Sequence, residues 1–184
     1  MASVDPNGNA TNGVTRHASN QNFDSNESSI KSTTGWDRDD YLNIWVAPTV
    51  GPLGYAYIPS TSALPNATVD GVVIVTTTFG GPNTGSSAPY DLGRTTTHEV
   101  GHYLGLDHTW GGSGGCGNDD GFTDTPSTDG PADQDPTFTC GMASYMSCGS
   151  VEAQYENYMD YATGCTVMFT QEQANYMLTI LQGI

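Results

Sequence analysis

Three of the four histidines in this chain lie within eleven residues, from His98 to His108. On an α-helix each residue advances by about 100° around the axis, so His98 and His102 would lie about 40° apart on one face. Glu99 would lie about 60° from His102, close enough to reach a water molecule held between the two imidazoles. Two imidazoles one turn apart, with a neighbouring carboxylate, are typical of a zinc site that activates water.

The third histidine requires the helix to end early. His108 would point about 240° away from His102 if the helix continued. Gly105 is placed to end it, because glycine adopts the left-handed conformation found at helix ends. The sequence therefore predicts catalytic Zn²⁺ bound by His98, His102 and His108, with Glu99 as the general base. The alternative is that these histidines are ordinary core residues; the offsets of Gly105 and His108 disfavour it, because both residues are uncommon.

The chain is strongly acidic, with 20 Asp and Glu against 4 Lys and Arg and a net charge of −16. Nucleic acids and anionic membranes bind basic surfaces, so neither is an expected partner. No run of about 20 apolar residues predicts a membrane span. Most of the carboxylates are expected to face solvent, although the charge also suits bound cations such as Ca²⁺.

Four cysteines lie between residues 116 and 165, in a segment rich in Gly and Asp. An even number in this setting indicates two disulfides and an oxidising compartment, with three connectivities left open. A second zinc site is the competing interpretation, but no Cys-x-x-Cys pair supports it. Residues 1–20 are polar and do not resemble a signal peptide, so a secreted protein would be present here in a mature or trimmed form.

Strand-forming residues dominate three short segments, at 41–47, 54–58 and 71–78. The last of these is a continuous β-branched run, which indicates a buried strand. Residues 1–40 are polar and are expected to form loop with short extended pieces. Residues 111–150 have little periodicity and are expected to be irregular and cross-linked.

Two helices are predicted. The first covers residues 91–104, with Asp91 as its N-cap. The second covers residues 170–181, where Thr170 and Gln173 form a reciprocal capping pair.

The pattern HExxHxxGxxH is followed about 50 residues later by Asn157-Tyr158-Met159-Asp160-Tyr161, and together they match the metzincin pattern with its methionine turn. The segments YLNIWV, GYAYIP, DGVVIV, LGRTTTHEVGHYLGLDHTWGG and ENYMDYATGCTVMFTQEQ resemble the pappalysin family of metallopeptidases, in family order. The similarity is to its small secreted members of the ulilysin and cytophagalysin type. It covers about residues 35–181 and is weaker before them.

The resemblance implies an α+β, metzincin-like zinc peptidase domain over residues 1–184. The upper part, about 1–105, would hold a small mixed sheet and the active-site helix. The lower part, about 106–184, would be a loop-rich, disulfide-linked subdomain with the methionine turn and a final helix. The family's catalytic domain normally starts with a strand and a long backing helix, and this N-terminal part is expected to be missing here.

The resemblance also assigns roles to individual residues. Met159 would form a hydrophobic floor below the zinc, and Tyr161 would hydrogen-bond the oxyanion of the tetrahedral intermediate. The disulfides would be Cys116–Cys148 and Cys140–Cys165. A structural Ca²⁺ site would use the side chains of Asp120 and Thr125 and the carbonyls of Asp119 and Thr123, because hard oxygen donors suit this ion.

These observations predict a secreted, monomeric zinc endopeptidase that acts on proteins or peptides. The alternative is a non-catalytic zinc- and calcium-binding interaction module, which the presence of Glu99 and Tyr161 disfavours. A metzincin of another family is disfavoured by the two disulfides and the NYMDY turn. In this family the segment 160–165 would line the pocket for the substrate residue just after the scissile bond. Asp160 belongs to the turn and is not expected to reach that pocket, so only a weak preference for arginine is expected. A carboxylate from residues 129–135 could enter the pocket and replace the missing charge.

Overall fold

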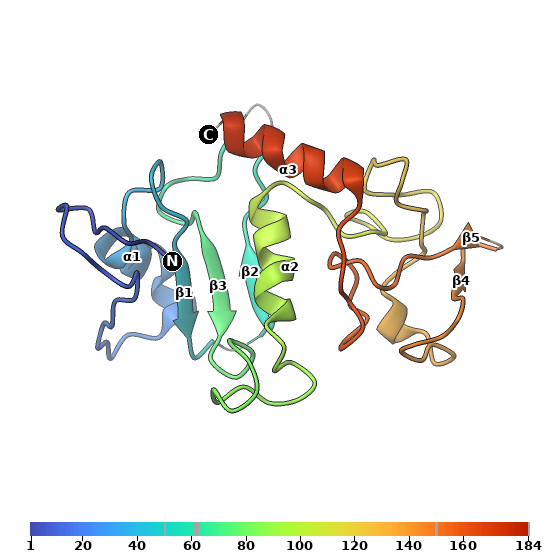
Figure 1. The fold of residues 1–184 in the computed structure, drawn as a ribbon, viewed down its shortest axis with the longest axis horizontal. Coiled ribbons are helices and arrows are strands. Elements are labelled where there is room, and N and C mark those ends of the chain that lie inside the picture. The colour runs from blue at the N-terminus through green and yellow to red at the C-terminus, as the bar shows by residue number, and fades with distance from the viewer. Residues whose placement is uncertain (50, 61–62, 150, 184) are drawn as a thin grey trace.

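The computed structural model describes residues 1–49, 51–60, 63–149 and 151–183. In this part of the chain the helices are α1 (Phe23–Thr34), α2 (Arg94–Tyr103), α3 (Gln171–Gly183) and a short 3₁₀ helix, η1 (Ala132–Gln134). The strands are β1 (Ile44–Ala47), β2 (Gly54–Ala56), β3 (Val72–Val75), β4 (Met146–Ser147) and β5 (Val151–Glu152). The sheet, α1 and α2 lie on one side of the molecule, the long loops on the other, and α3 crosses the top (Figure 1).

The predicted small mixed sheet is confirmed. Its order is β1-β3-β2, with β1 parallel and β2 antiparallel to β3. The β-branched run of β3 lies at the centre, and Val72, Val73 and Ile74 are fully buried. Alternate side chains point to opposite faces, so Val72 and Ile74 pack under Tyr103 of α2 while Val73 packs against Phe23 of α1.

The expectation that residues 1–40 contain only loop and extended pieces is wrong, because α1 lies there. Asn22 is its N-cap, and its side chain accepts a hydrogen bond from the Ser25 amide. Phe23 and Lys31 are buried, and the Lys31 ammonium donates to the carbonyl of Val69 at 2.6 Å. The buried face of this helix includes the aliphatic stem of a lysine and few apolar side chains. Its sequence therefore lacks the apolar stripe by which a helix is usually predicted.

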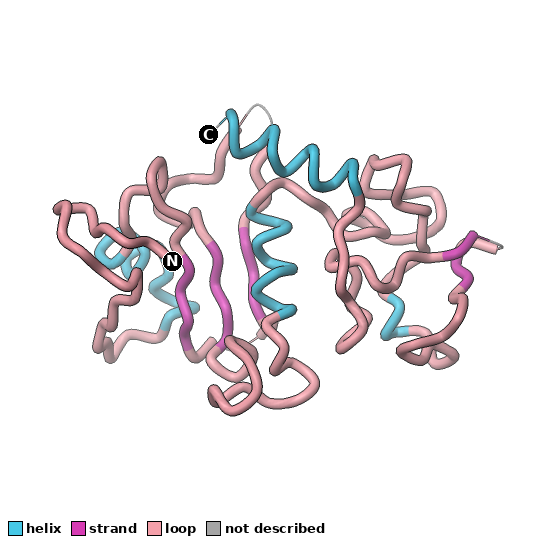
Figure 2. The backbone as a smooth tube through the Cα atoms, viewed as in Figure 1, coloured by secondary structure: helices cyan, strands magenta, loops and turns pink. Residues whose placement is uncertain are grey.

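The regular elements are shorter than predicted, as the predominance of loop in Figure 2 shows. Helix α2 begins at Arg94, and its N-cap is Gly93, with φ 71°, so the assignment of Asp91 is wrong. The capping pair before α3 is confirmed. The Gln173 amide donates to Thr170 Oγ1 at 3.2 Å, and the Thr170 amide donates to Gln173 Oε1 at 2.9 Å.

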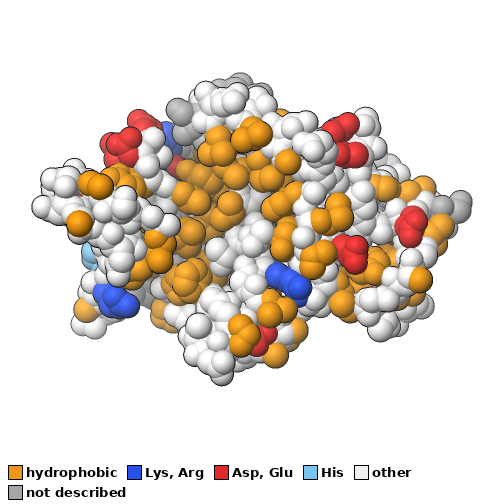
Figure 3. All heavy atoms as spheres, viewed as in Figure 1, with side chains coloured by type: hydrophobic (Ala, Val, Ile, Leu, Met, Phe, Trp, Pro, Cys, Tyr) orange, Lys and Arg blue, Asp and Glu red, His pale blue; other side chains and the backbone are white. Residues whose placement is uncertain are grey.

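One face of β1 is only partly covered in the part of the chain that the structure describes. Ile44 and Val46 pair in register with Val72 and Ile74 and so share the face on which α2 packs. They are 39% and 42% exposed, whereas their neighbours on β3 are fully buried. Apolar side chains gather over this part of the sheet in Figure 3. Parallel strand pairs are normally covered on both faces, so this surface departs from the usual arrangement.

The loop-rich part has little regular structure and is held by cross-links. The structure contains the disulfides Cys116–Cys148 and Cys140–Cys165, the pairing that the family resemblance implied. They close loops of 32 and 25 residues, which corresponds to about 3.5 kcal/mol of chain entropy each. A small aromatic core that includes Tyr145 and Tyr155 lies between them. Among the described helices, none combines the length and apolarity needed to cross a membrane.

Gly105 generates a stability prediction. Its φ is 90°, and a Cβ there would lie 2.8 Å from Tyr176 Cε1 and 3.0 Å from Ile180 Cγ1 of α3. Gly105→Ala should therefore lower the free energy of unfolding by about 2–4 kcal/mol, from left-handed strain and overpacking. Urea denaturation measures this. The control is Gly130→Ala, where a Cβ meets nothing within 4 Å; equal stability of the two variants would contradict the prediction.

Candidate metal centre

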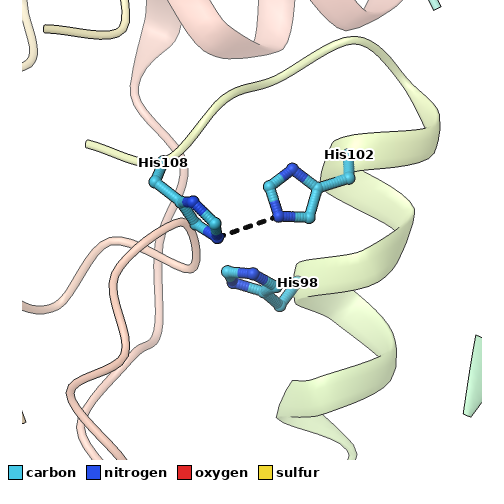
Figure 4. Close-up of side chains that lie close together, drawn as sticks. All are labelled: His98, His102 and His108. Carbon is cyan, nitrogen blue, oxygen red and sulfur yellow. Dashed lines mark hydrogen bonds between the residues drawn. The ribbon is translucent and has the colours of Figure 1, made fainter. Parts of the chain in front are cut away.

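Helix α2 and the turn after it bring the three predicted histidines together. His98 and His102 lie one turn apart on α2 and are 8% and 7% exposed. The helix ends at Tyr103, Gly105 takes the left-handed conformation, and the Leu106 amide bonds back to the Gly101 carbonyl at 3.0 Å. The reversed chain then presents His108, and Figure 4 shows the three imidazoles pointing toward one another.

The spacing of the imidazole nitrogens suits a tetrahedral ion. One nitrogen from each of the three rings lies within 4.8 Å of the others, and the Nε2 atoms of His102 and His108 are 3.1 Å apart. A tetrahedral ion with Zn–N bonds of about 2.0–2.1 Å separates its ligands by about 3.3 Å. Nδ1 of His98 lies 2.6 Å from the Tyr158 carbonyl, and Nδ1 of His102 lies 2.8 Å from the Leu106 carbonyl. These bonds leave Nε2 free as the ligand atom.

The electrostatics of the site keep the imidazoles neutral. Burial, followed by the charge of His102, lowers the pKa of His98 to about 4. Burial, followed by the charges of its two neighbours, lowers the pKa of His108 to about 3. Burial also lowers the pKa of His102. At neutral pH all three rings therefore have the unprotonated nitrogen that metal binding requires.

Glu99 lies in the wall of a cleft of about 300 Å³ beside the histidines. It is 6% exposed, and burial raises its pKa to about 8. Strand β2 forms the adjacent edge of the sheet, and a Cβ added at Gly54 would lie 2.8 Å from Glu99 Cγ. The side chain of Glu99 thus packs against the edge strand and shares the cleft with His98.

The methionine turn packs against the helix and the turn that carry the histidines. Met159 is fully buried, and a Cβ at Gly101 would approach its sulfur to 2.5 Å. Gly101 is therefore the helix position that admits the methionine. Tyr161 is 41% exposed, and its ring lies 5.3 Å from that of His98 and 4.8 Å from that of His108. Burial, followed by the charges of Glu99 and other acids, raises the Tyr161 pKa, so its hydroxyl is a proton donor at neutral pH.

Three residues with ionisable side chains, besides Glu99 and His98, are among those that line the cleft: Arg94, Asp133 and Asp160. Arg94 donates to the carbonyl of Gly164 and ties the start of α2 to the segment after the methionine turn. Asp133, from η1, also lines the cleft, and burial raises its pKa. The carboxylate of Asp160 instead accepts hydrogen bonds from the amides of Ala132 and Ala162, so it is occupied within the turn.

The predicted calcium residues lie in a loop that docks on α3. Asp120 Oδ2 accepts a hydrogen bond from Gln173 Nε2 at 3.2 Å, and burial raises its pKa to about 6. Thr125 is buried, whereas Asp119 is exposed, with Oδ1 accepting from the Gly121 amide. The amide and hydroxyl of Thr123 both donate to Glu172 on α3, which leaves its predicted contribution, the backbone carbonyl, a prediction.

Sequence reasoning missed three residues of these sites. Asp124 has a buried Oδ1 without a hydrogen-bond partner among the described atoms. Gly101 carried a signal, since an interior helix glycine usually has a packing reason. Trp110 carried a weaker signal, which was its position two residues after His108 in the sequence.

A helix-borne His-Glu pair, a glycine that ends the helix, and a third histidine above a methionine turn define a metal centre of the metzincin class. The family model described as Pregnancy-associated plasma protein-A matches residues 24–182, so the chain belongs to that peptidase family. This confirms the resemblance to the pappalysins.

The similar proteins are proteases. The chain is 37% identical to Extracellular metalloprotease 1 of Coccidioides posadasii, over 84% of this chain and 54% of that protein. It is 39% identical to an Extracellular metalloprotease of Colletotrichum graminicola, over 76% of this chain and 49% of that protein. The chain thus spans about half the length of these relatives.

A solved structure of mature mirolysin from Tannerella forsythia, in complex with a cleaved peptide, superposes with a TM-score of 0.83 and 35% identity. The match covers 99% of this chain and 72% of that one. It confirms the metzincin-like α+β fold.

Proposed function

We propose that this chain is the catalytic part of a zinc-dependent endopeptidase that acts outside the cell. The observation that carries the proposal is the convergence of three neutral imidazoles beside a buried carboxyl group in the wall of an open cleft. The extracellular setting is supported by the names of the fungal relatives and by the two disulfides, which persist in oxidising compartments.

The metal in this proposal is Zn²⁺, held by Nε2 of His98, His102 and His108. The spacing of the nitrogens and the carbonyl partners of two Nδ1 atoms fit this ion. When bound, zinc supplies Lewis acidity, which polarises a carbonyl and makes a neighbouring water more acidic.

The side chains of the cleft perform the proton transfers. Glu99 takes a proton from the attacking water and returns it to the leaving amine. Burial raises its pKa, which makes the carboxylate a stronger base than a solvated one. The Tyr161 hydroxyl donates a hydrogen bond to the oxyanion that develops on the scissile carbonyl. The edge strand β2 aligns an extended substrate beside Glu99 through backbone hydrogen bonds.

Glu99→Gln tests the assignment of the base. The variant keeps the shape of the side chain but cannot accept the proton, so kcat should fall by about 10²–10⁴-fold while the zinc content is unchanged. Peptide-library cleavage and metal analysis measure the two quantities. The matched control is Glu152→Gln, an exposed acid on β5. Near-normal turnover of Glu99→Gln would exclude it as the base, and zinc binding without peptidase activity in the unaltered protein would favour the non-catalytic module.

We further propose a structural Ca²⁺ in the loop of residues 119–125. Asp119 and Thr123 would contribute carbonyls, and Asp120 and Thr125 side-chain oxygens. Two buried groups support the proposal: the raised pKa of Asp120 marks a carboxyl group without a counter-charge, and Oδ1 of Asp124 has no hydrogen-bond partner among the described atoms. A hard cation in the loop would satisfy both.

Calcium should therefore stabilise the fold against heat. At free Ca²⁺ of 100 times its Kd, the stabilisation is about 2.7 kcal/mol, and Mg²⁺ should give much less. Calorimetry with and without Ca²⁺ measures the shift in Tm, and Asp120→Asn should reduce it. Glu156→Gln, an exposed acid outside the loop, serves as the control. An unchanged shift in Asp120→Asn would place the ion elsewhere, and no shift in the unaltered protein would exclude the site.

Asp133 bears on the choice of substrate. The Asp160 carboxylate accepts hydrogen bonds from the amides of Ala132 and Ala162, whereas Asp133, from the segment 129–135, also lines the cleft. We propose that Asp133 favours a basic residue just after the scissile bond, in place of the weak preference expected from residues 160–165 alone.

Asp133→Asn should lower kcat/KM for peptides with Arg or Lys at that position by about fivefold, because a partly exposed ion pair contributes up to about 1 kcal/mol. Peptides with apolar residues there should be unaffected. Asp39→Asn makes the same change in net charge far from the cleft and separates local pairing from general attraction. An unchanged ratio of basic to apolar cleavage in Asp133→Asn would refute this role.

A further inference from the structure

The three imidazoles are not oriented in the same way. His98 and His102 each place Nδ1 within hydrogen-bond distance of a backbone carbonyl, Tyr158 and Leu106 respectively. For His108 the nearest carboxylate oxygen is Asp107 Oδ1, 4.0 Å from Nδ1, which is beyond a hydrogen bond. That oxygen instead accepts from the backbone amide of His108 at 2.8 Å. Rotation of the His108 ring about its Cβ–Cγ bond is therefore not fixed by any hydrogen bond recorded for its Nδ1.

An indole covers one face of the His108 ring. The rings of Trp110 and His108 are stacked, with centroids 4.5 Å apart and planes 12° from parallel. Trp110 is only 8% exposed, although the side chain of His108 itself is partly exposed. A face-to-face contact with a fixed, buried indole restricts the plane of the imidazole, which is the degree of freedom that a hydrogen bond at Nδ1 would otherwise restrict.

The turn that carries Trp110 is itself anchored. The Gly111 amide donates to the His108 carbonyl at 2.8 Å, which folds the indole back over the imidazole. Gly111 has φ 68°, and a Cβ there would lie 2.6 Å from the Asp119 carbonyl oxygen. Thr109, which lies between His108 and Trp110 in the sequence, is 1% exposed, and its amide donates to the Met159 carbonyl at 3.4 Å. The stack is thus held by contacts to the methionine turn and the acidic loop.

Trp110 also contacts the tyrosine of the cleft. Its ring lies 5.0 Å from that of Tyr161 with planes 74° apart, and Tyr161 meets His108 in a similar edge contact at 4.8 Å. Edge-to-face and stacked pairs at these distances are favourable by about 0.5–1.5 kcal/mol each. The indole face also stabilises the positive charge that an imidazole gains as a metal ligand.

We infer that Trp110 is a positioning residue for the third metal ligand: its indole holds the His108 ring in the plane that directs Nε2 toward the other two imidazoles. The inference rests on the proposed zinc site. For His98 and His102, hydrogen bonds to backbone carbonyls orient the ring; for His108, stacking on Trp110 would orient it.

The test is the zinc dissociation constant, measured by competition with a chromogenic chelator, for the unaltered protein and for Trp110→Leu and Trp110→Phe. Loss of an outer partner of a ligand typically weakens metal binding by about 10–100-fold, and Trp110→Leu should show this loss. Trp110→Phe retains an aromatic face and should stay within about threefold of the unaltered protein. Trp36→Leu is the control, because Trp36 makes an edge contact with Tyr41 and lines a separate cavity away from the histidines.

Far-UV circular dichroism of the zinc-free forms identifies variants that fold. If Trp110→Leu does not fold, Trp110→Met replaces it, and the absorption bands of the cobalt-substituted Phe and Met variants report the ligand geometry directly. Zinc affinity of a folded Leu or Met variant within twofold of the unaltered protein would overturn the inference, as would equal losses in the Phe variant. Absence of zinc binding in the unaltered protein would instead refute the proposed site itself.

Discussion

The structure depends on one reversal of the chain at Gly105. His98 and His102 lie on α2. The third histidine reaches them only because α2 ends at Tyr103 and the chain then turns at Gly105, which has a left-handed conformation. The same glycine lies against Tyr176 and Ile180 of α3, so the final helix packs on the point of reversal. The position therefore joins the ligand geometry to the packing of the C-terminal helix.

The metal centre is closely packed, and the chain as a whole has few positively charged side chains. Met159 packs closely against α2 because Gly101 has no side chain. Of the chain's 4 Lys and Arg residues, Lys31, Arg38 and Arg94 each donate to a backbone carbonyl of a loop, at Val69, Pro65 and Gly164 respectively. These three cationic side chains thus hold loops in place by hydrogen bonds, while the excess of acidic residues gives the chain a net charge of −16.

The sequence predicted the parts of the molecule in which spacing and chemistry coincide. The offsets of His98, Gly105 and His108 determine the helix, its end and the convergence of the ligands, and the β-branched run at residues 72–75 determines the central strand. Helix α1 was not predictable in this way, because it buries Lys31 rather than an apolar stripe. Nor was the stacking of Trp110 on His108. For the cleft, the sequence indicated only that a carboxylate from residues 129–135 could enter it, without identifying Asp133. These depend on how residues without periodicity fold between the cross-links.

The central claim is that three imidazoles of one chain form a zinc site, and X-ray absorption at the zinc edge tests it most directly. After reconstitution with one equivalent of Zn²⁺, the account predicts three imidazole nitrogens at about 2.0–2.1 Å, completed by a light-atom ligand. The absence of tightly bound zinc, or a shell of sulfur at about 2.3 Å, would contradict it.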